Sequence, residues 1–160
     1  MSVQVNAQLI CTVNEQGSVV DAPSGFNTVI HRTFNSALAL NANSSPPASQ
    51  VAAFTQALVG GVSTIDLTNL IGTFGTVNGT GLRVQVIKIK NSSTSNTMTF
   101  KFGGSNPYNL LGASWQIILP AGGEAEFFLN NGAPVVGSGA KNIDMSGTGT
   151  DSAQIIIVLG

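Results

Sequence analysis

The feature that most constrains this chain is an alternation of apolar and polar residues, with a period of two, in short runs separated by turn residues. In SVQVNAQLICTV, residues 2–13, alternate positions from Val3 to Cys11 share one face of an extended strand. Comparable runs follow along the chain: SGFNTVIHRTF, VSTIDLTNL, LRVQVIKIKN, TMTFKF, WQIILP, EAEFFLN and AQIIIVLG. Because helical periodicity is almost absent, the pattern predicts an all-β fold.

The spacing of these runs indicates the architecture. About eight strands at intervals of about 10 to 20 residues favour a sandwich or a barrel, and we expect an antiparallel, jelly-roll-like β-sandwich. NEQGS, residues 14–18, predicts a turn after the first strand. SQVAAFTQALVGG, residues 49–61, fits both a helix capped by Ser49 and a strand, and its strand neighbours favour strand. The alternation slips in parity near Val86 and Ile87, which predicts a β-bulge there.

The domain organisation predicted is a single β-sandwich domain over residues 1–160, a usual length for one hydrophobic core. Residues 41–49, NANSSPPAS, are linker-like, because Pro46 and Pro47 forbid a helix and favour an extended connection. Residues 1–45 are therefore expected to be an N-terminal arm or extra strands that dock on a neighbour.

Charge is scarce, and this narrows the classes of partner. Charged residues make up 8% of the chain, the net charge is -1 and the pI is about 5.6, so nothing indicates nucleic-acid binding. The basic residues Arg83, Lys88 and Lys90 are interpreted as a solvated strand face. Asn, Ser, Thr, Gly and Gln fill the polar positions, and such a neutral surface suits packing against copies of the chain or a partner, because no charge must be desolvated.

Targeting and membrane signals are weak in this sequence. It has no apolar run of the length of a membrane span and no signal-peptide pattern, so we expect no membrane partner and synthesis in a cytoplasm-like compartment. Cys11 is the single cysteine, which excludes a disulfide within the chain, and a small buried hydrophobe is its expected role.

Catalytic residues are not predicted, and neither is a cofactor. His31 is the single histidine, no serine lies in a G-x-S-x-G turn, and Cys11 has no activating neighbours, so we expect that the protein is not an enzyme. Glu124 and Glu126 share a strand face, where they are expected to keep an edge strand soluble rather than to act as an acid–base pair.

A metal site would most naturally use Asp144 and Asp151 of NIDMSGTGTDSAQ, with Asp66. Calcium needs six to eight oxygen ligands, and three isolated aspartates do not supply them, so no metal site is predicted. The segment is instead interpreted as a turn into the closing strand, with positive φ at Gly147 and Gly149 and aspartates that accept amides. TIDLT and NIDMS share a pattern, which suggests that both segments are edges of the same sandwich.

Two aromatic residues allow an alternative function. Tyr108 and Trp115 could form a platform on which a sugar stacks, which would make the chain a carbohydrate-binding, adhesin-like β-sandwich module. The competing interpretation is that Trp115, which opens the strand WQIILP, is a core residue. Exposure of the two rings on one rim would distinguish these alternatives.

Residues 62–160 resemble a group of small virion-associated proteins of tailed bacteriophages, of the kind that decorate or cement capsids. The motifs that carry the resemblance are TIDLT, GGSNPYNLLGASW, IILPAGGEAEFFLN and NIDMSGTGTDSAQIIIVLG. The resemblance implies a jelly-roll-like β-sandwich, a homotrimer, a location in the virion after synthesis in the host cytoplasm, and contact with the major capsid protein or another virion protein. It implies no catalytic, cofactor or metal residues, and it would place the adhesin-like alternative on the virion surface or tail.

The closing strand adds an independent indication of assembly. Ile155, Ile157 and Leu159 lie on one face, while Ile156 and Val158 lie on the other. A strand that is apolar on both faces is expected between two layers or against another subunit.

Overall fold

The protein is all-β: a computed structural model describes residues 7–20 and 27–160, with only the backbone described up to residue 38, and contains no helix in these ranges. The prediction of an all-β, antiparallel fold is confirmed. The strands are β1 (Ala7–Val20), β2 (Asn27–Leu40), β3 (Gln50–Ala57), β4 (Val62–Asp66), β5 (Leu70–Gly72), β6 (Gly75–Val77), β7 (Val84–Asn91), β8 (Met98–Phe102), β9 (Gln116–Leu119), β10 (Glu124–Phe128), β11 (Asn142–Ser146) and β12 (Ser152–Leu159).

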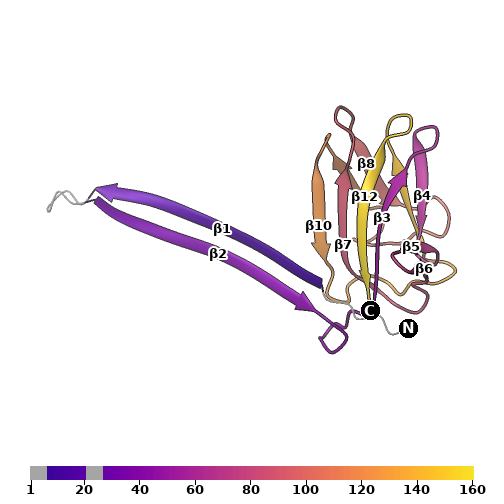
Figure 1. The fold of residues 1–160 in the computed structure, drawn as a ribbon, viewed down its shortest axis with the longest axis horizontal. Helices are drawn as coiled ribbons and strands as arrows, with labels where there is room; N and C mark the ends of the chain where they lie inside the picture. Colours follow the sequence, from indigo (N-terminus) through magenta and orange to yellow (C-terminus); the bar gives the residue numbers. More distant parts are fainter. Residues whose placement is uncertain (1–6, 21–26) are drawn as a thin grey trace.

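Residues 48–160, here called the body, form two four-stranded antiparallel sheets (Figure 1). The strand order is β10-β7-β12-β3 in one sheet and β4-β11-β8-β9 in the other. β3 pairs with β12, β4 with β11, β7 with β10, and β8 with β9, so the last half of the body pairs back onto the first half. The short hairpin of β5 and β6 lies beside β3.

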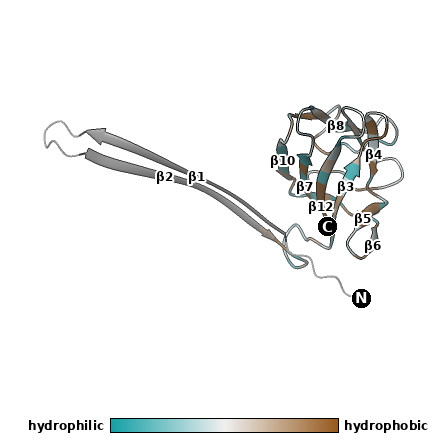
Figure 2. Cartoon of the chain, turned by 45° about the horizontal axis from the view of Figure 1, so that its top comes forward, coloured by the Kyte–Doolittle hydropathy of each residue, from teal (hydrophilic) through white to brown (hydrophobic). Residues whose placement is uncertain are grey.

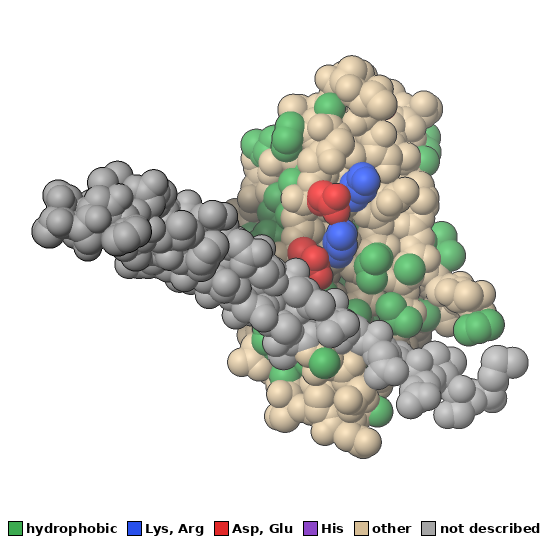
Figure 3. Space-filling model, turned by 60° about the vertical axis from the view of Figure 1, so that its left-hand side comes forward, with side chains coloured by type: hydrophobic (Ala, Val, Ile, Leu, Met, Phe, Trp, Pro, Cys, Tyr) green, Lys and Arg blue, Asp and Glu red, His purple; other side chains and the backbone are tan. Residues whose placement is uncertain are grey.

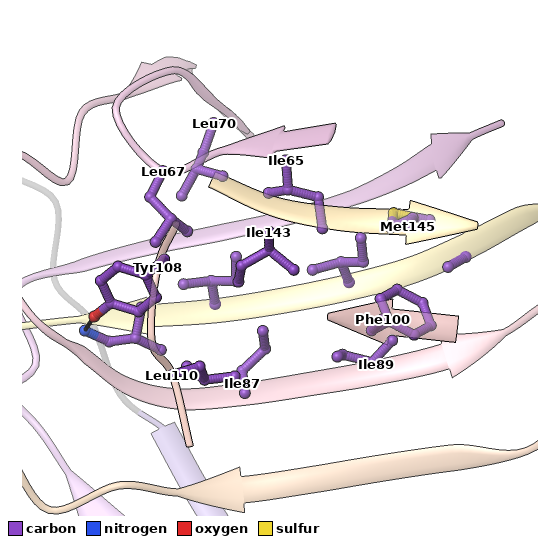
Figure 4. Close-up of a cluster of buried hydrophobic side chains, with 14 of the residues drawn as sticks. Ile65, Leu67, Leu70, Ile87, Ile89, Phe100, Tyr108, Leu110, Ile143 and Met145 are labelled. Atoms are coloured by element: carbon purple, nitrogen blue, oxygen red, sulfur yellow. Dashed lines mark hydrogen bonds between the residues drawn. The ribbon is translucent and has the colours of Figure 1, made fainter. Parts of the chain in front are cut away.

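One hydrophobic core contains residues from both sheets of the body. Alternate residues of β7 and β12 belong to it, including Ile87, Ile89, Ile155 and Ile157, all of which are buried. Phe100 of β8 packs into the same core, which Figure 4 shows as a continuous cluster. Burial of each large apolar side chain contributes about 1.5–3 kcal/mol, so this cluster is the main source of stability in the body. The strands carry hydrophilic residues as well as hydrophobic ones (Figure 2).

A register irregularity in β7 explains the slip in the alternation. The pairing with β12 passes from Val158↔Val86 to Leu159↔Val84, which leaves Gln85 without a Cα partner. The predicted irregularity is confirmed, one residue before the expected position. Gln85 is fully buried, and its amide donates to Asn131 Oδ1 at 2.6 Å and accepts from the Asn131 backbone N–H at 3.1 Å. The extra residue therefore fastens the loop after β10 to the sheet.

β1 and β2 form a two-stranded hairpin, which Figure 1 shows extending away from the body. Their register is continuous from Ala7↔Leu40 to Val20↔Asn27. The turn predicted at NEQGS is wrong, because residues 14–18 lie inside β1 and each pairs with a residue of β2. Long-range pairing with β2 overrides the local preference of Asn and Gly for turns. Residues 2–6 of the first predicted strand lie outside the described residues.

The joint between the hairpin and the body is a small second hydrophobic cluster. Leu40, the last residue of β2, and Ala48 are buried with Val86 and Val158. The intervening loop is closed by hydrogen bonds, since the Ala48 N–H donates to the carbonyl of Asn41 at 2.9 Å. The outer side of β12 is therefore partly covered by the same chain, while Gln154 and Ile156 on that side stay exposed.

Two further sequence-based predictions can be compared with the strands. Residues 50–57 are a strand, β3, which confirms that choice over a helix. The similar segments TIDLT and NIDMS belong to neighbouring strands, with Ile143 of β11 paired with Ile65 of β4. β4 is at the edge of its sheet, but β11 lies between β4 and β8, so the prediction that both are edges is wrong for β11. The similarity of the two sequences does not show which of the two strands also pairs with a third strand.

Candidate functional site

A ladder of alternating charges lies on the outer side of the sheet β10-β7-β12-β3. Lys88 Nζ is 3.0 Å from Glu124 Oε2, and Lys90 Nζ is 4.0 Å from Glu124 Oε1. The register places Glu126 opposite Lys88 and Glu124 opposite Lys90, so the two lysines of β7 face the two glutamates of β10 (Figure 3). The hydrogen bond between Lys88 and Glu124 raises the pKa of the lysine and lowers the pKa of the carboxyl group.

The charged ladder is a solvated strand face rather than a binding site for a charged ligand. Its lysines and glutamates offset one another, and the exposure of both partners keeps each ion pair weak. A shallow groove beside it is lined by Ala53, Thr55, Gln154 and Ile156, among others. Arg83 does not belong to this ladder, because its guanidinium donates to the carbonyl of Ala133. β10 is an edge strand, as expected for Glu124 and Glu126.

A second groove runs between the start of β3 and the hairpin of β5 and β6. Its lining includes Val51, Thr73, Phe74 and Val77. Phe74 is 78% exposed, and Ile71 on the same hairpin is also exposed. The groove is lined by no charged or titratable side chain, so its chemistry is limited to apolar contact and to hydrogen bonds from the backbone and from neutral side chains such as Gln50 and Asn78.

Asp66, the last residue of β4, is engaged by Lys141 and Thr68. Its Oδ2 accepts from Lys141 Nζ at 2.7 Å, and its Oδ1 accepts from the backbone N–H and the hydroxyl of Thr68 at 2.9 and 2.6 Å. Burial by itself would raise the pKa of Asp66, but the hydrogen bonds from Lys141 and Thr68 together outweigh it, so the pKa is lowered.

Asp144 and Asp151 are each engaged separately. Asp144 accepts from the Thr64 hydroxyl at 2.8 Å and from the Gly104 N–H at 2.7 Å, while Asp151 accepts from the Asn96 amide at 2.9 Å. The interpretation that turn amides are accepted fits the contact of Asp144 with Gly104, but Asp151 contacts a side chain. Within the part of the chain that the structure describes, no three acidic, histidine or cysteine residues are grouped as a metal site requires.

The glycines before β12 have different roles. Gly149 has a φ of 54°, as expected for the turn, and its carbonyl accepts from the Gly61 N–H at 2.8 Å. Gly147 is not in the positive-φ region; an added Cβ there would lie 3.0 Å from Leu58 Cδ1. The prediction of positive φ is therefore right for Gly149 and wrong for Gly147, where close packing is what favours glycine.

Tyr108 and Trp115 are core residues, so they do not form a sugar platform. Tyr108 is fully buried and Trp115 is 6% exposed. The Tyr108 hydroxyl donates to the carbonyl of Pro134 at 2.7 Å and accepts from the Val84 N–H at 3.2 Å, and Trp115 Nε1 donates to the Tyr108 carbonyl at 2.8 Å. Desolvation raises the pKa of Tyr108 to about 12. The ring stands among apolar residues in Figure 4. Tyr108 lies in a loop between turn residues, where the sequence shows no periodicity that would indicate burial.

His31 and Cys11 lie on the hairpin, where the backbone register separates them. His31 is paired with Gln16, and Cys11 is paired with Ser36. Because alternate residues of a strand lie on opposite faces, the register assigns His31 and Cys11 to different faces of the ribbon. The backbone therefore does not bring this histidine and this cysteine together as a base and a nucleophile.

Comparisons with protein-family models, with curated proteins and with solved structures found no match for this chain. In the ranges that the structure describes, no helix has the length and hydropathy needed to cross a bilayer.

Proposed function

We propose that this chain is a structural component of a bacteriophage virion that decorates or cements the capsid through non-covalent contacts. Its partner in this proposal is the major capsid protein or another virion protein, and it acts as a homotrimer without enzymatic activity or a cofactor. The motifs in residues 62–160 that resemble virion-associated proteins support this assignment.

The observation that carries the proposal is that a compact body is joined to a long hairpin, which pairs with no other sheet among the described strands. The acidic residues Asp66, Asp144 and Asp151 are engaged in separate structural contacts of the body. The long hairpin of β1 and β2 makes a ladder only within itself, among the strands that are described. A protein that stabilises a shell acts through buried area repeated over symmetric copies, and a projecting hairpin offers such area.

The fold that we propose for the body is a jelly-roll β-sandwich. A chain that folds into one long antiparallel ribbon and then winds up has its first strand paired with its last, its second with its last but one, and so on. The eight strands of the two sheets pair in this order: β3 with β12, β4 with β11, β7 with β10, and β8 with β9. Successive pairs alternate between the two sheets, which supports the proposal further.

The adhesin-like alternative receives no support from the aromatic pair on which it rested. Both Tyr108 and Trp115 are buried, and their polar atoms are occupied by backbone groups. We therefore retain the virion structural role as the proposed function.

Co-sedimentation with particles tests the proposed function. Purified particles of the source phage are expected to contain this chain in a fixed ratio to the major capsid protein, and cryo-electron microscopy is expected to show it on the shell. The full-length protein added to particles that lack it should sediment with them and saturate. Its absence from purified particles, together with a failure to sediment with them, would overturn the proposal.

A further inference from the structure

The two sheets of the body have four edge strands, and three of them carry features that discourage pairing with a further strand. β10 carries Glu124 and Glu126, β9 has four residues and is followed by Pro120, and β4 has five residues and ends on Asp66. Charges, prolines and short strands are the usual protection of sheet edges. β3 has eight residues, none of them charged and none a proline, so among these four strands it is the edge without such protection.

Alternate residues of β3 direct their backbone groups away from β12. The Leu58 N–H donates to the carbonyl of Asp151 at 2.8 Å, and the register continues from there through β3 without a shift. In an antiparallel ladder every second residue bonds to the partner strand, so residues of even number in β3 bond to β12. The N–H and carbonyl groups of Ala53, Thr55 and Ala57 therefore point outward.

These three residues, Ala53, Thr55 and Ala57, are here called the open edge. All three are exposed. Within the described residues no backbone hydrogen bond reaches their outward groups, and the one side-chain contact is from the Gln56 amide to the Ala57 carbonyl at 3.4 Å. The start of β3 differs, because the hairpin of β5 and β6 lies against Val51 and lines a groove with it. The open edge thus offers unpaired backbone groups on a neutral strand.

We propose that the open edge binds the open edge of a second copy of the chain. The two β3 strands run antiparallel about a two-fold axis and join their sheets into one continuous sheet, in the manner of strand addition. Because neither strand carries a charge, no charge must be desolvated when they meet.

The open edge is complementary to itself. A two-fold axis at Thr55 pairs this residue with Thr55 of the second copy, and it pairs Ala53 with Ala57 of the second copy. Every outward N–H and carbonyl of the three residues then has a partner in the other copy. Their side chains are small and lie on the exposed outer side of the sheet, so the strand itself does not obstruct the approach.

The ends of β3 add apolar surface to the same contact. The hairpin of β5 and β6, with Ile71 and Phe74, flanks the start of β3, and the turn into β4, with Val59 and Val62, follows its end. All four side chains are more than half exposed. Antiparallel pairing sets the start of one strand beside the end of the other, so the hairpin of each copy lies level with the turn of its neighbour. A strand from another protein would satisfy the same backbone groups, but a second copy also supplies these apolar ends.

The geometry of an edge limits this contact to two copies. An edge strand has one free side, and the added strand occupies it. A two-fold axis uses the same surface on both copies, so the association closes and does not continue into a fibre.

Cysteine cross-linking tests the register directly. In a Cys11→Ser background, Thr55→Cys is expected to form a disulfide between copies on mild oxidation, because such paired residues have Cα atoms about 5.5 Å apart. Gln154→Cys, at the neighbouring exposed position on β12, is the matched control and is expected to stay unlinked. A Thr55→Cys protein that links no faster than this control would overturn the inference.

Single and mixed variants distinguish a two-fold pair from chance collision. Ala53→Cys alone leaves its two introduced thiols about 14 Å apart along the strands, at about 3.4 Å per residue, and Ala57→Cys alone does the same. An equal mixture of the two variants places one introduced thiol opposite the other, so linked dimers are expected in the mixture only. Linking of either variant by itself at the same rate would overturn the register.

Solution mass measures the association without a cross-link. Light scattering coupled to size exclusion is expected to give an even number of chains of 16.3 kDa, either a pair or two paired homotrimers. Thr55→Lys is expected to halve that mass, because it sets two ammonium groups against each other at the axis, whereas Gln154→Lys is expected to leave it unchanged. A wild-type protein of one or three chains at micromolar concentration would overturn the inference.

Substitutions at the apolar ends test the rest of the contact. Phe74→Asp and Val59→Asp are each expected to weaken the association at least about tenfold, since each loses apolar burial. Ile118→Asp is the matched control, because Ile118 is also exposed but lies on β9, at the far edge of the other sheet. Fluorescence of the buried Trp115 controls for folding in every variant. An effect of Ile118→Asp as large as those at the ends would contradict this placement, as would no effect at the ends.

The inference goes beyond the proposed function, and the two can fail separately. All of these experiments use free protein and require no particle. Copies that cross-link but are absent from particles would overturn the virion role alone, and a chain that sediments with particles without cross-linking would overturn the pairing of β3 alone. If Thr55→Lys abolished the sedimentation of such a chain, the open edge would belong to a strand of the capsid partner instead.

Discussion

The body and the hairpin are built from the same kind of strand, yet they use their apolar residues differently. In the body, the two sheets share one core, so residues such as Ile89 and Ile157 have no exposed surface. In the hairpin, the ladder of β1 and β2 is as regular as any in the body, but it forms a sheet of two strands only.

The difference shows that hydrogen-bonded pairing and burial are separate requirements. Backbone pairing satisfies the N–H and carbonyl groups that point at the partner strand, but it does not provide a second layer over the faces of a two-stranded ribbon. The body provides that layer within one chain, through pairings such as β3 with β12 that are distant in sequence. The hairpin pairs only within itself among the described strands, so it provides no second layer of its own.

The largest expected effect contrasts one phenylalanine from each region. Phe100→Ala is expected to lower the free energy of unfolding of the body by about 3–5 kcal/mol, because Phe100 is fully buried in the core. Phe34→Ala is expected to change the same transition by less than about 0.5 kcal/mol, since β2 lies outside the two sheets. Urea unfolding followed by Trp115 fluorescence measures both. Equal losses from the two variants would show that hairpin and body unfold as one unit.

The joint between the two regions is the next largest expectation. Leu40→Ala is expected to destabilise the body by about 2–3 kcal/mol, because it opens a cavity over Val86 and Val158. Asn43→Ala, at an exposed position in the same loop, is the matched control and is expected to be neutral. Thermal unfolding of both variants makes the comparison. If Leu40→Ala were as neutral as the control, the hairpin would not be fastened to the sheet by this cluster.

Tyr108→Phe tests the polar side of the body's core. The change leaves the carbonyl of Pro134 and the N–H of Val84 without the hydroxyl, which is expected to cost about 1–3 kcal/mol at neutral pH. Urea unfolding measures the loss.

The same tyrosine predicts sensitivity to alkali. Because the pKa of Tyr108 rises from 10.0 to about 12 in the folded state, the unfolded state loses its proton first. Stability is therefore expected to fall as pH rises above 10, and the fall should be smaller in Tyr108→Phe. Since Tyr108 is the single tyrosine, phenolate absorbance reports its titration directly. A titration midpoint near 10 in the folded protein would contradict the burial.

The smallest expected effect is at Asp66, the last residue of β4. Because its pKa is lowered in the folded state, its contribution is complete above the ordinary value of 3.8 and is lost as pH falls below it. Asp66→Asn is expected to lower the free energy of unfolding by less than about 1 kcal/mol at pH 6, since the ion pair with Lys141 is partly exposed. The difference from the wild type should vanish near pH 2. A difference that persists there would indicate that the loss arises from packing rather than from charge.

Sequence reasoning was most successful where the signal is local. The alternation in LRVQVIKIKN predicted both the strand and its irregularity, because the side of a strand on which each residue lies follows directly from its position. It failed at NEQGS, whose turn-forming residues are held in β1 by pairing with β2. It also left open whether Tyr108 and Trp115 are exposed, because a loop residue is buried or exposed according to what packs over it.

The sequence by itself determined that this chain is all-β, low in charge, and able to form amphipathic strands on both sides of residues 41–49. Only the tertiary structure decided which apolar strand faces are buried, and by which residues. Ile157 and Val158 are adjacent and equally apolar, yet one lies in the main core and the other lies under Leu40 and Ala48. The reason is physical: alternation acts between neighbours in the chain, whereas burial depends on strands and loops that are brought together from distant positions.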